Sequence, residues 1–379
     1  SGWKKESNAR SNSSLFAIFD GHCGNQAARY ASEKFLHYLQ QEIGSQSSMV
    51  DAEAMKVALG ESLRKLDYRF CNICQEDGRA WESGTTALVA MIVDKKMIIA
   101  NLGDCRGIIC RSVEQAKYIG KDDWAVLDTE EANGHPEGVT NGGGSRRVCV
   151  WKEIADVHKP SDTSEKARIE QANGWITTET EIPIGQLRRM DFLDEDVVGI
   201  LRRCFSDRYE NSGTTIRECK AAPQRILQIH RVCGELAVSR ALGDRDFKAS
   251  FHMTAEERIV EGSLWESPLM FAYPNAHSCR FTGDLVANSP DFQEIELDEE
   301  DASEEFLLLA SDGLWDVLDA DDAARVTRDL LFRRKWTAKR AAARLAELAI
   351  HLGSSDNVTV IVIRVKDIVA GHEAEVSQP

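Results

Sequence analysis

The segment LFAIFDGH, residues Leu15 to His22, is an apolar run that ends in an acidic turn. The same pattern recurs in the stretches Met97 to Asp104 and Phe306 to Gly313. In a fourth stretch, Ser355 to Val365, the acidic turn comes before the apolar run. Runs this short and this apolar are typical of buried strands, so an aspartate is predicted at one end of each of four strands.

These four aspartates, Asp20, Asp104, Asp312 and Asp356, predict a metal site if they converge. Each one alone is better explained as a turn residue, because Asp-Gly and Asp-Asn pairs are common in turns. Taken together, carboxylates at the ends of buried strands would repel one another unless a cation neutralised them. Ligands that are all oxygen atoms favour magnesium or manganese over zinc.

Eight short segments, spread over most of the chain, match one known family in the family's own order. They are Phe19 to His22, Ser83 to Ala87, Asn101 to Arg106, His158 to Asp162, Glu165 to Gly174, Leu236 to Asp244, Ala310 to Val317 and Gly353 to Val360. Through these segments the chain resembles the metal-dependent protein serine/threonine phosphatases of the type 2C (PPM) family. One segment alone would be weak support, whereas eight in register are specific.

The resemblance implies an α+β fold, a four-layer α-β-β-α sandwich. Two central antiparallel sheets are flanked by pairs of helices, with the metals in a cleft at one end of the sheets. We expect a single type 2C phosphatase catalytic domain over residues 1–379, because site segments from Asp20 to Asp356 must meet. The apolar share of 42% is enough for a substantial core.

The periodicity of apolar residues predicts two pairs of helices and a hairpin. The helices are expected over Asn25 to Gly44, Asp51 to Gln75, Ala320 to Phe332 and Thr337 to Leu352, and the hairpin over Ala87 to Val93 and Met97 to Leu102. Thr337 is a plausible N-cap and Gly353 a plausible stop for the last helix.

Three stretches are longer than the family pattern requires: about 112–149, 181–230 and 249–288. The first is predicted to be a mobile surface loop because it is rich in glycine and charge. The second contains a possible short helix around Val197 to Phe205. The third is too aromatic for a plain linker, with Trp265, Phe271, Tyr273 and Phe281. These insertions either select a substrate or partner, or are surface additions without such a role.

The resemblance also implies the chemistry. Asp20 would bridge two divalent ions, Mg²⁺ or Mn²⁺, and the Gly21 carbonyl, Asp312 and Asp356 would complete the protein ligands. A water molecule held between the ions would then attack the phosphate, so no side chain is the nucleophile. His22 resembles the family's proposed general acid, and an intrinsic pKa near 6.5 suits that task at neutral pH.

Other residues that match family positions are interpreted as supports for the strand ends. They are Thr85, Thr86, Arg106, Arg240 and His158.

Two departures from the family pattern affect the site. Lys4 stands where the family has a phosphate-gripping arginine, and Asn8 falls roughly where a metal-linked glutamate is expected. Lysine binds phosphate as a point charge and cannot grip two oxygens, so weaker substrate binding is expected. Val157 replaces an aspartate that, with the residues matched here by Asp312 and Asp316, helps hold a third, weaker metal. Valine cannot ligate an ion, which argues against that third site.

The leading hypothesis is therefore a protein serine/threonine phosphatase, a phosphoric monoester hydrolase acting on phosphorylated proteins. The alternative is a pseudophosphatase that keeps the fold and binds partners through its insertions. A phosphoesterase acting on small molecules is a third possibility, which the Arg240 and His158 segments disfavour.

The formal charge of -16 argues against nucleic acid or an anionic membrane as the main partner. No apolar run reaches transmembrane length, and the first residues show no signal-peptide pattern. The ten cysteines form no disulfide framework. A cytoplasmic or nuclear setting is the resulting expectation.

Overall fold

The computed structural model describes residues 13–44, 52–74, 81–93, 96–114, 124–127, 147–181, 227–253, 263–297 and 305–369. Four features named above lie outside these residues: Lys4, Asn8, the glycine-rich part of the first insertion and the expected helix around Val197 to Phe205.

One sheet contains four antiparallel strands in the order β1-β4-β5-β12. Their bounds are β1 (Ser13–Ile18), β4 (Ala87–Val93), β5 (Lys96–Leu102) and β12 (Asp291–Glu296). Val93 pairs with Lys96, which confirms the predicted hairpin. Successive side chains of a strand point to opposite faces, and β4 is buried along its whole length, so both faces of this sheet are covered.

A second sheet contains five antiparallel strands in the order β14-β13-β6-β8-β7. Their bounds are β6 (Arg106–Glu114), β7 (Ala125–Val126), β8 (Arg147–Glu153), β13 (Phe306–Ala310) and β14 (Val360–Arg364). The prediction of a surface loop from Ser112 to Cys149 is wrong at both ends, because Ser112 and Cys149 pair with each other and are buried. The run from Val148 to Trp151 is continuously apolar, as in a buried strand, and the glycine content of the middle of the segment obscured that signal.

The helices form two main groups. The first is α1 (Gln26–Gly44) with α2 (Ala52–Ile73), and the second is α8 (Asp312–Trp315), α9 (Ala320–Arg328) and α10 (Ala338–Leu352). The predicted helix to Phe332 changes to a π-helical turn over Asp329–Arg333. Thr337 caps α10 by accepting a hydrogen bond from the Arg340 backbone N–H at 3.2 Å, and Gly353 ends it at φ 100°. Both predicted ends of this helix are confirmed.

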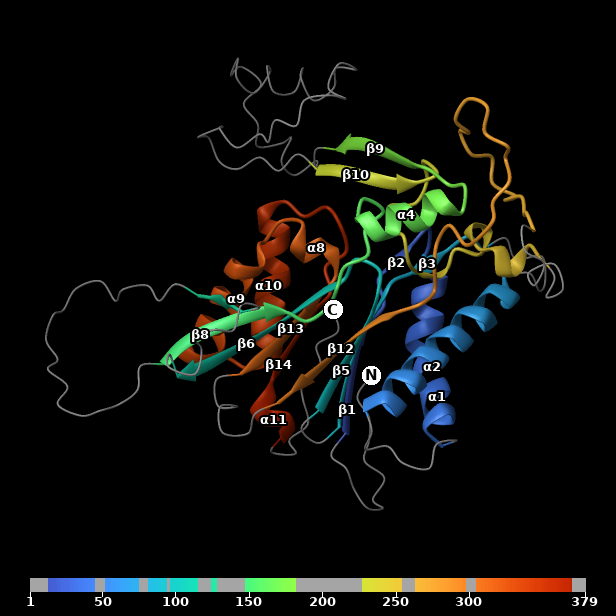
Figure 1. Ribbon diagram of the computed structural model, residues 1–379. Coiled ribbons are helices and arrows are strands. Elements are labelled where there is room, and N and C mark those ends of the chain that lie inside the picture. The colour runs from blue at the N-terminus through green and yellow to red at the C-terminus, as the bar shows by residue number, and fades with distance from the viewer. Residues whose placement is uncertain are drawn as a thin grey trace, which may run out of the picture.

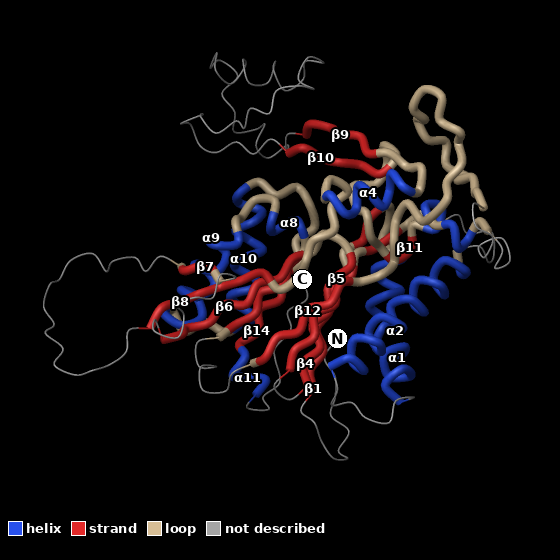
Figure 2. The backbone as a smooth tube through the Cα atoms, viewed as in Figure 1, coloured by secondary structure: helices blue, strands red, loops and turns tan. Residues whose placement is uncertain are grey.

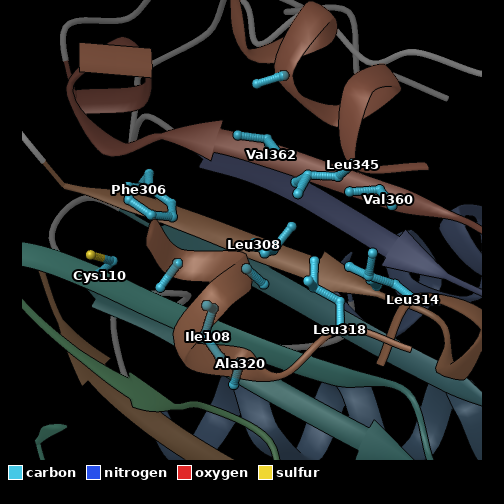
Figure 3. Packing of buried hydrophobic residues seen from close by; sticks show 14 of the residues in the cluster. Ile108, Cys110, Phe306, Leu308, Leu314, Leu318, Ala320, Leu345, Val360 and Val362 are labelled. Atoms are coloured by element: carbon cyan, nitrogen blue, oxygen red, sulfur yellow. The ribbon is translucent and has the colours of Figure 1, made fainter. Parts of the chain in front are cut away.

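Three apolar clusters hold these elements together. Between the sheets, Leu88 and Ile99 of the first sheet share a cluster with Leu307 and Leu309 of the second. On the outer face of the first sheet, α1 and α2 bury residues such as Leu63. On the outer face of the second sheet, α8 to α10 pack against β6, β13 and β14 (Figures 2 and 3), and the cluster includes Leu308, Leu314, Leu345 and Val362.

A further unit lies beyond one end of the two sheets (Figure 1). It contains α4 (Thr163–Gln171) and the hairpin of β9 (Ile176–Glu181) and β10 (Leu227–Val232). The part of the third insertion from 263 to 288 has little regular structure, yet it packs on this unit through a shared core. That core includes Trp265, Phe271, Phe281, Phe247 and Ile169, with Tyr273 against it. This described part of the insertion is therefore folded, and its role in selecting a partner stays a prediction.

Candidate functional site

Five aspartates gather at the end of the two sheets, and we call them the acidic cluster: Asp20, Asp104, Asp312, Asp316 and Asp356. Asp20 and Asp104 each follow a strand of the first sheet, β1 and β5. Asp312 follows β13 of the second sheet, and Asp316 lies one helical turn later. The sheets pack face to face, so strand ends far apart in the sequence meet here.

Backbone hydrogen bonds fix the first of these aspartates. The Asp20 carbonyl accepts from the Thr86 N–H at 2.8 Å and from the Thr85 hydroxyl at 2.9 Å. Thr86 also contacts the buried Cys105 thiol at 3.2 Å. The Thr85-Thr86 pair therefore supports the turn after β1, as the sequence predicted.

The turns that carry Asp312 and Asp356 are held together directly. The Ser311 hydroxyl donates to the Asn357 carbonyl at 3.2 Å and accepts from the Thr359 N–H at 3.1 Å. A Cβ atom at Gly313 would lie 2.4 Å from the Asn357 carbonyl oxygen, so only glycine allows this approach. The Ser-Asp-Gly and Ser-Asp-Asn motifs thus dock on each other through their small residues.

Burial and neighbouring carboxylates raise the pKa of two members of the cluster, Asp20 and Asp312. Burial, followed by Asp356 and Asp104, raises the pKa of Asp20, against an opposing hydrogen bond with Asp312. Burial, followed by Asp104, Asp20, Asp316 and Asp356, raises the pKa of Asp312. One carboxylate oxygen of Asp312, Oδ1, is buried without a hydrogen-bond partner. This site has an excess of negative charge and an unsatisfied oxygen ligand.

These features fit a divalent cation chemically. The available ligands are carboxylate and carbonyl oxygens, which suit magnesium or manganese. Within the segments that the structure describes, no three acidic, histidine or cysteine side chains are placed to hold an ion by themselves. Carbonyl oxygens and water molecules commonly complete the coordination of such ions.

The sequence of this chain matches the model of a known protein family. The family model described as Protein phosphatase 2C matches residues 1–133 and 207–358, which is more than half of the chain. The chain belongs to the protein phosphatase 2C family. The predicted resemblance is confirmed.

Relatives by sequence have the same family name. The chain is 25% identical to "Protein phosphatase 2C 57" of Arabidopsis thaliana, over 92% of this chain and 67% of that protein. It is 28% identical to "Probable protein phosphatase 2C 43" of the same plant, over 92% of this chain and 56% of the relative. Human "Protein phosphatase 1A" is 24% identical over 92% of this chain and 62% of its own length. The chain thus spans between about half and two thirds of these relatives.

Two solved structures share the fold. The Toxoplasma gondii serine-threonine phosphatase 2C aligns with a TM-score of 0.51 at 16% identity, over 92% of this chain and 84% of that one. A C. elegans sex determining protein aligns with a TM-score of 0.51 at 19% identity, over 95% of this chain and 59% of that one. The mixed helix and sheet fold predicted from the sequence is confirmed. None of the helices that the structure describes is long and apolar enough to span a bilayer.

A network of paired charges lies next to the acidic cluster. It consists of Arg240, Glu165, Asp291 and His158, and we call it the Arg240 network. Arg240 donates to Glu165 at 2.8 and 3.0 Å and to Asp291 at 2.9 Å. His158 contacts Asp291 through Nε2 at 2.9 Å and accepts from the Gly103 N–H through Nδ1 at 3.1 Å. Both residues connect structural elements, as the sequence predicted.

Burial alone would raise the pKa of Glu165, but hydrogen bonds from Arg240 and Arg168 outweigh it and lower that pKa. Burial is outweighed in the same way at Asp291, whose pKa is lowered by hydrogen bonds from His158 and Arg240. These acids are therefore neutralised within the protein, unlike those of the acidic cluster.

The predicted general acid, His22, lies next to the acidic cluster. Burial would lower its pKa, but Asp244, Asp104 and Asp20 together raise it. Asp244 was not predicted to be part of the site, although it ends the quoted segment Leu236 to Asp244. The sequence gives no local signal that residues 22 and 244 are in contact.

The residues of the possible third metal site are only partly brought together. Asp316 is close enough to Asp312 and Asp104 to raise the pKa of both. The Asp156 side chain is exposed, and its carbonyl accepts from the Asn101 amide at 2.6 Å. Val157 is half-buried and offers no ligand. The third site therefore lacks one carboxylate of the family pattern.

Proposed function

We propose that this chain hydrolyses phosphoserine and phosphothreonine in proteins with two divalent ions, Mg²⁺ or Mn²⁺. The observation that supports the proposal most directly is the acidic cluster, in which burial and repulsion between neighbouring carboxylates raise the pKa of Asp20 and Asp312. Such repulsion disfavours the ionised site in the absence of a cation and favours binding of one. Membership of the protein phosphatase 2C family links this cluster to phosphate ester chemistry.

Asp20, the Gly21 carbonyl, Asp312 and Asp356 are the residues proposed to hold the ions. When bound, such ions would lower the pKa of a coordinated water molecule and neutralise the phosphoryl oxygens. The contribution of the chain is to fix the ligands, through Thr85 and Thr86 at Asp20 and through Ser311 at the Asp312 turn.

His22 is proposed to protonate the departing serine or threonine oxygen. An alkoxide is a poor leaving group, so proton donation matters most for these substrates. The raised pKa of His22 favours the protonated ring that this role requires. Lys4 is proposed to contact the phosphate as a point charge.

We also propose that the two sheets and their helices form the four layers of a single catalytic domain. Packing of the two sheets on each other, with α1 and α2 on one outer face and α8 to α10 on the other, supports a four-layer sandwich forming one catalytic domain. The aromatic insertion beside α4 is a candidate surface for substrate proteins or partners. A cytoplasmic or nuclear location remains our expectation.

The test is hydrolysis of a phosphoserine peptide and a generic aryl phosphate, with manganese and with a chelator. We expect manganese-dependent turnover of both substrates. A folded, metal-binding chain that hydrolyses neither would support the pseudophosphatase alternative. Turnover of the aryl phosphate but of no phosphoprotein would indicate a small-molecule phosphoesterase.

A further inference from the structure

His22 and Asp244 meet across a glycine in a small three-stranded sheet. Its strands, in the order β11-β3-β2, are β11 (Leu242–Gly243), β3 (Gly84–Thr85) and β2 (Gly21–His22). Gly84 pairs with His22 on one side and with Gly243 on the other. His22 Nε2 lies 2.9 Å from Asp244 Oδ1 and 2.8 Å from Oδ2.

This contact depends on the absence of a side chain at Gly84. A Cβ atom there would lie 2.2 Å from Asp244 Oδ2 and 2.3 Å from His22 Nε2. Gly84 does not have the left-handed φ that favours glycine. The space above the strand, and not the backbone conformation, therefore explains why glycine is needed at this position.

Asp244 is itself held rigidly. It adopts a left-handed conformation with φ 46°, which is uncommon for a residue other than glycine, and its side chain is 1% exposed. The preceding Gly243 donates its N–H to Asp67 at 2.7 Å. Asp67 is in turn paired with Lys248 at 2.8 Å, and both side chains are fully buried. A buried ion pair thus anchors the turn that points Asp244 at His22.

The contact determines which ring nitrogen remains available. An ionised carboxylate only accepts hydrogen bonds, so His22 Nε2 must be the donor. The hydrogen bonds found for His22 among the described residues all use Nε2. Its imidazole is 23% exposed, and none of the hydrogen bonds found for it among the described residues uses the second nitrogen, Nδ1.

We propose that Asp244 is a positioning residue that holds His22 through Nε2, so that Nδ1 is the nitrogen that protonates the leaving oxygen. The inference rests on the proposed phosphatase function. As the bond between phosphorus and the serine oxygen breaks, its electron pair stays with that oxygen and the Nδ1 proton joins it. The attacking water forms the new bond to phosphorus and releases one proton to solvent. The neutral ring keeps its hydrogen on Nε2, where it remains hydrogen-bonded to Asp244. Solvent then returns a proton to Nδ1.

The first experiment observes the contact without using activity. In protein labelled with ¹⁵N at histidine, we expect a downfield proton on His22 Nε2 that is protected from exchange with water, assigned by its loss in His22→Gln. Asp244→Asn keeps the size and the left-handed backbone, because asparagine tolerates that conformation. Gly84→Ala keeps both partners and separates them. The protected proton should be lost in both variants.

The second experiment separates positioning from a merely structural role. For Asp244→Asn we expect kcat on a phosphoserine peptide to fall about tenfold or more, with a much smaller loss on an aryl phosphate whose leaving group needs no proton. KM should stay nearly constant. Asp246→Asn is the matched control, because this neighbouring acid does not contact His22, and it should leave both readouts unchanged.

Several outcomes would overturn the inference. One is that wild-type His22 carries its protected proton on Nδ1, or carries no protected proton. Another is that the protected Nε2 proton persists in Asp244→Asn. Equal kinetic losses on the two substrates would also do so. If Asp244→Asn fails to fold, Gly84→Ala supplies the same two readouts. If wild type hydrolyses neither substrate with manganese, the phosphatase proposal fails; if it hydrolyses both while the proton readout fails, only the role of Asp244 fails.

Discussion

The acidic cluster and the Arg240 network stand side by side, yet their charges are arranged in opposite ways. In the network, basic partners lower the pKa of Glu165 and Asp291. In the cluster, burial and neighbouring carboxylates raise the pKa of Asp20 and Asp312. Acids that are matched within the protein stabilise its structure, whereas acids that repel one another favour binding of a cation.

The largest expected effect comes from removing a ligand from the acidic cluster. Asp20→Asn and Asp312→Asn should each lower kcat by at least about 100-fold. Loss of a residue that only hydrogen-bonds to a metal ligand already costs up to about 100-fold, and loss of the ligand itself should cost at least as much. Both variants should fold, and without metal they should melt at or above the wild-type temperature, because a repulsive charge is gone. Turnover at saturating manganese and a melting curve measure the two effects. Near-normal turnover in either variant would remove that residue from the metal site.

Replacing Lys248 should lower the stability of the folded protein. Lys248→Met leaves Asp67 charged and buried without its partner, which costs about 3–5 kcal/mol of unfolding free energy. Lys166→Met is the control, because its pairing with Glu170 at 3.8 Å is exposed and contributes at most about 1 kcal/mol. Urea unfolding measures both. Equal losses in the two variants would show that burial does not distinguish these pairs.

His22→Ala tests the chemical group beside the cluster. Without a general acid, turnover of a phosphoserine peptide should fall about 100-fold or more, and turnover of an aryl phosphate much less. The fold should be retained, since the ring is partly exposed. Similar losses on both substrates would mean that His22 is not the acid.

Glu165→Gln tests the matched charges through their pH dependence. The pKa of Glu165 is lowered in the folded protein, so its ionised form contributes stability above its ordinary pKa of 4.5. That contribution, about 1.5–3 kcal/mol for hydrogen bonds to a charged group, is lost as pH falls below 4.5 through the folded value. Unfolding free energies of wild type and variant should therefore differ at pH 7 and converge at acidic pH. A constant difference would contradict the assignment.

The smallest expected effect concerns the third metal. Val157→Asp restores an oxygen ligand near Asp312 and Asp316, so activity at high magnesium or manganese should rise modestly. Without metal the variant should be slightly less stable, because the new carboxylate adds repulsion. A metal titration of activity and melting temperature compares the two proteins. Identical titrations would show that residue 157 does not face the cluster.

Much of the fold could be predicted because its signals are local. Apolar runs revealed β4, β5 and β13, and the cap residues Thr337 and Gly353 marked the ends of α10. The strands at Ser112 and Cys149 were missed because a long glycine-rich segment separates them, and their pairing is not a local property.

The candidate site also contains residues that could be predicted from local sequence and one that could not. Asp20, Asp312 and Asp356 stand in motifs at strand ends, so the sequence pointed to them, and their metal-binding role stays a prediction. Asp244 could not be predicted, because its contact with His22 depends on three strands meeting and on the space above Gly84. Gly84 is needed because it leaves room for the side chains of His22 and Asp244, and the sequence alone does not distinguish it from other glycines.

The central claim is that the acidic cluster is a divalent cation site. Calorimetric titration of the metal-free protein with manganese tests it most directly, for wild type, Asp312→Asn and Glu165→Gln. We predict that wild type and Glu165→Gln bind manganese with similar affinity, and that Asp312→Asn binds it at least about tenfold more weakly. Equal binding by wild type and Asp312→Asn, or no binding by wild type, would contradict the account.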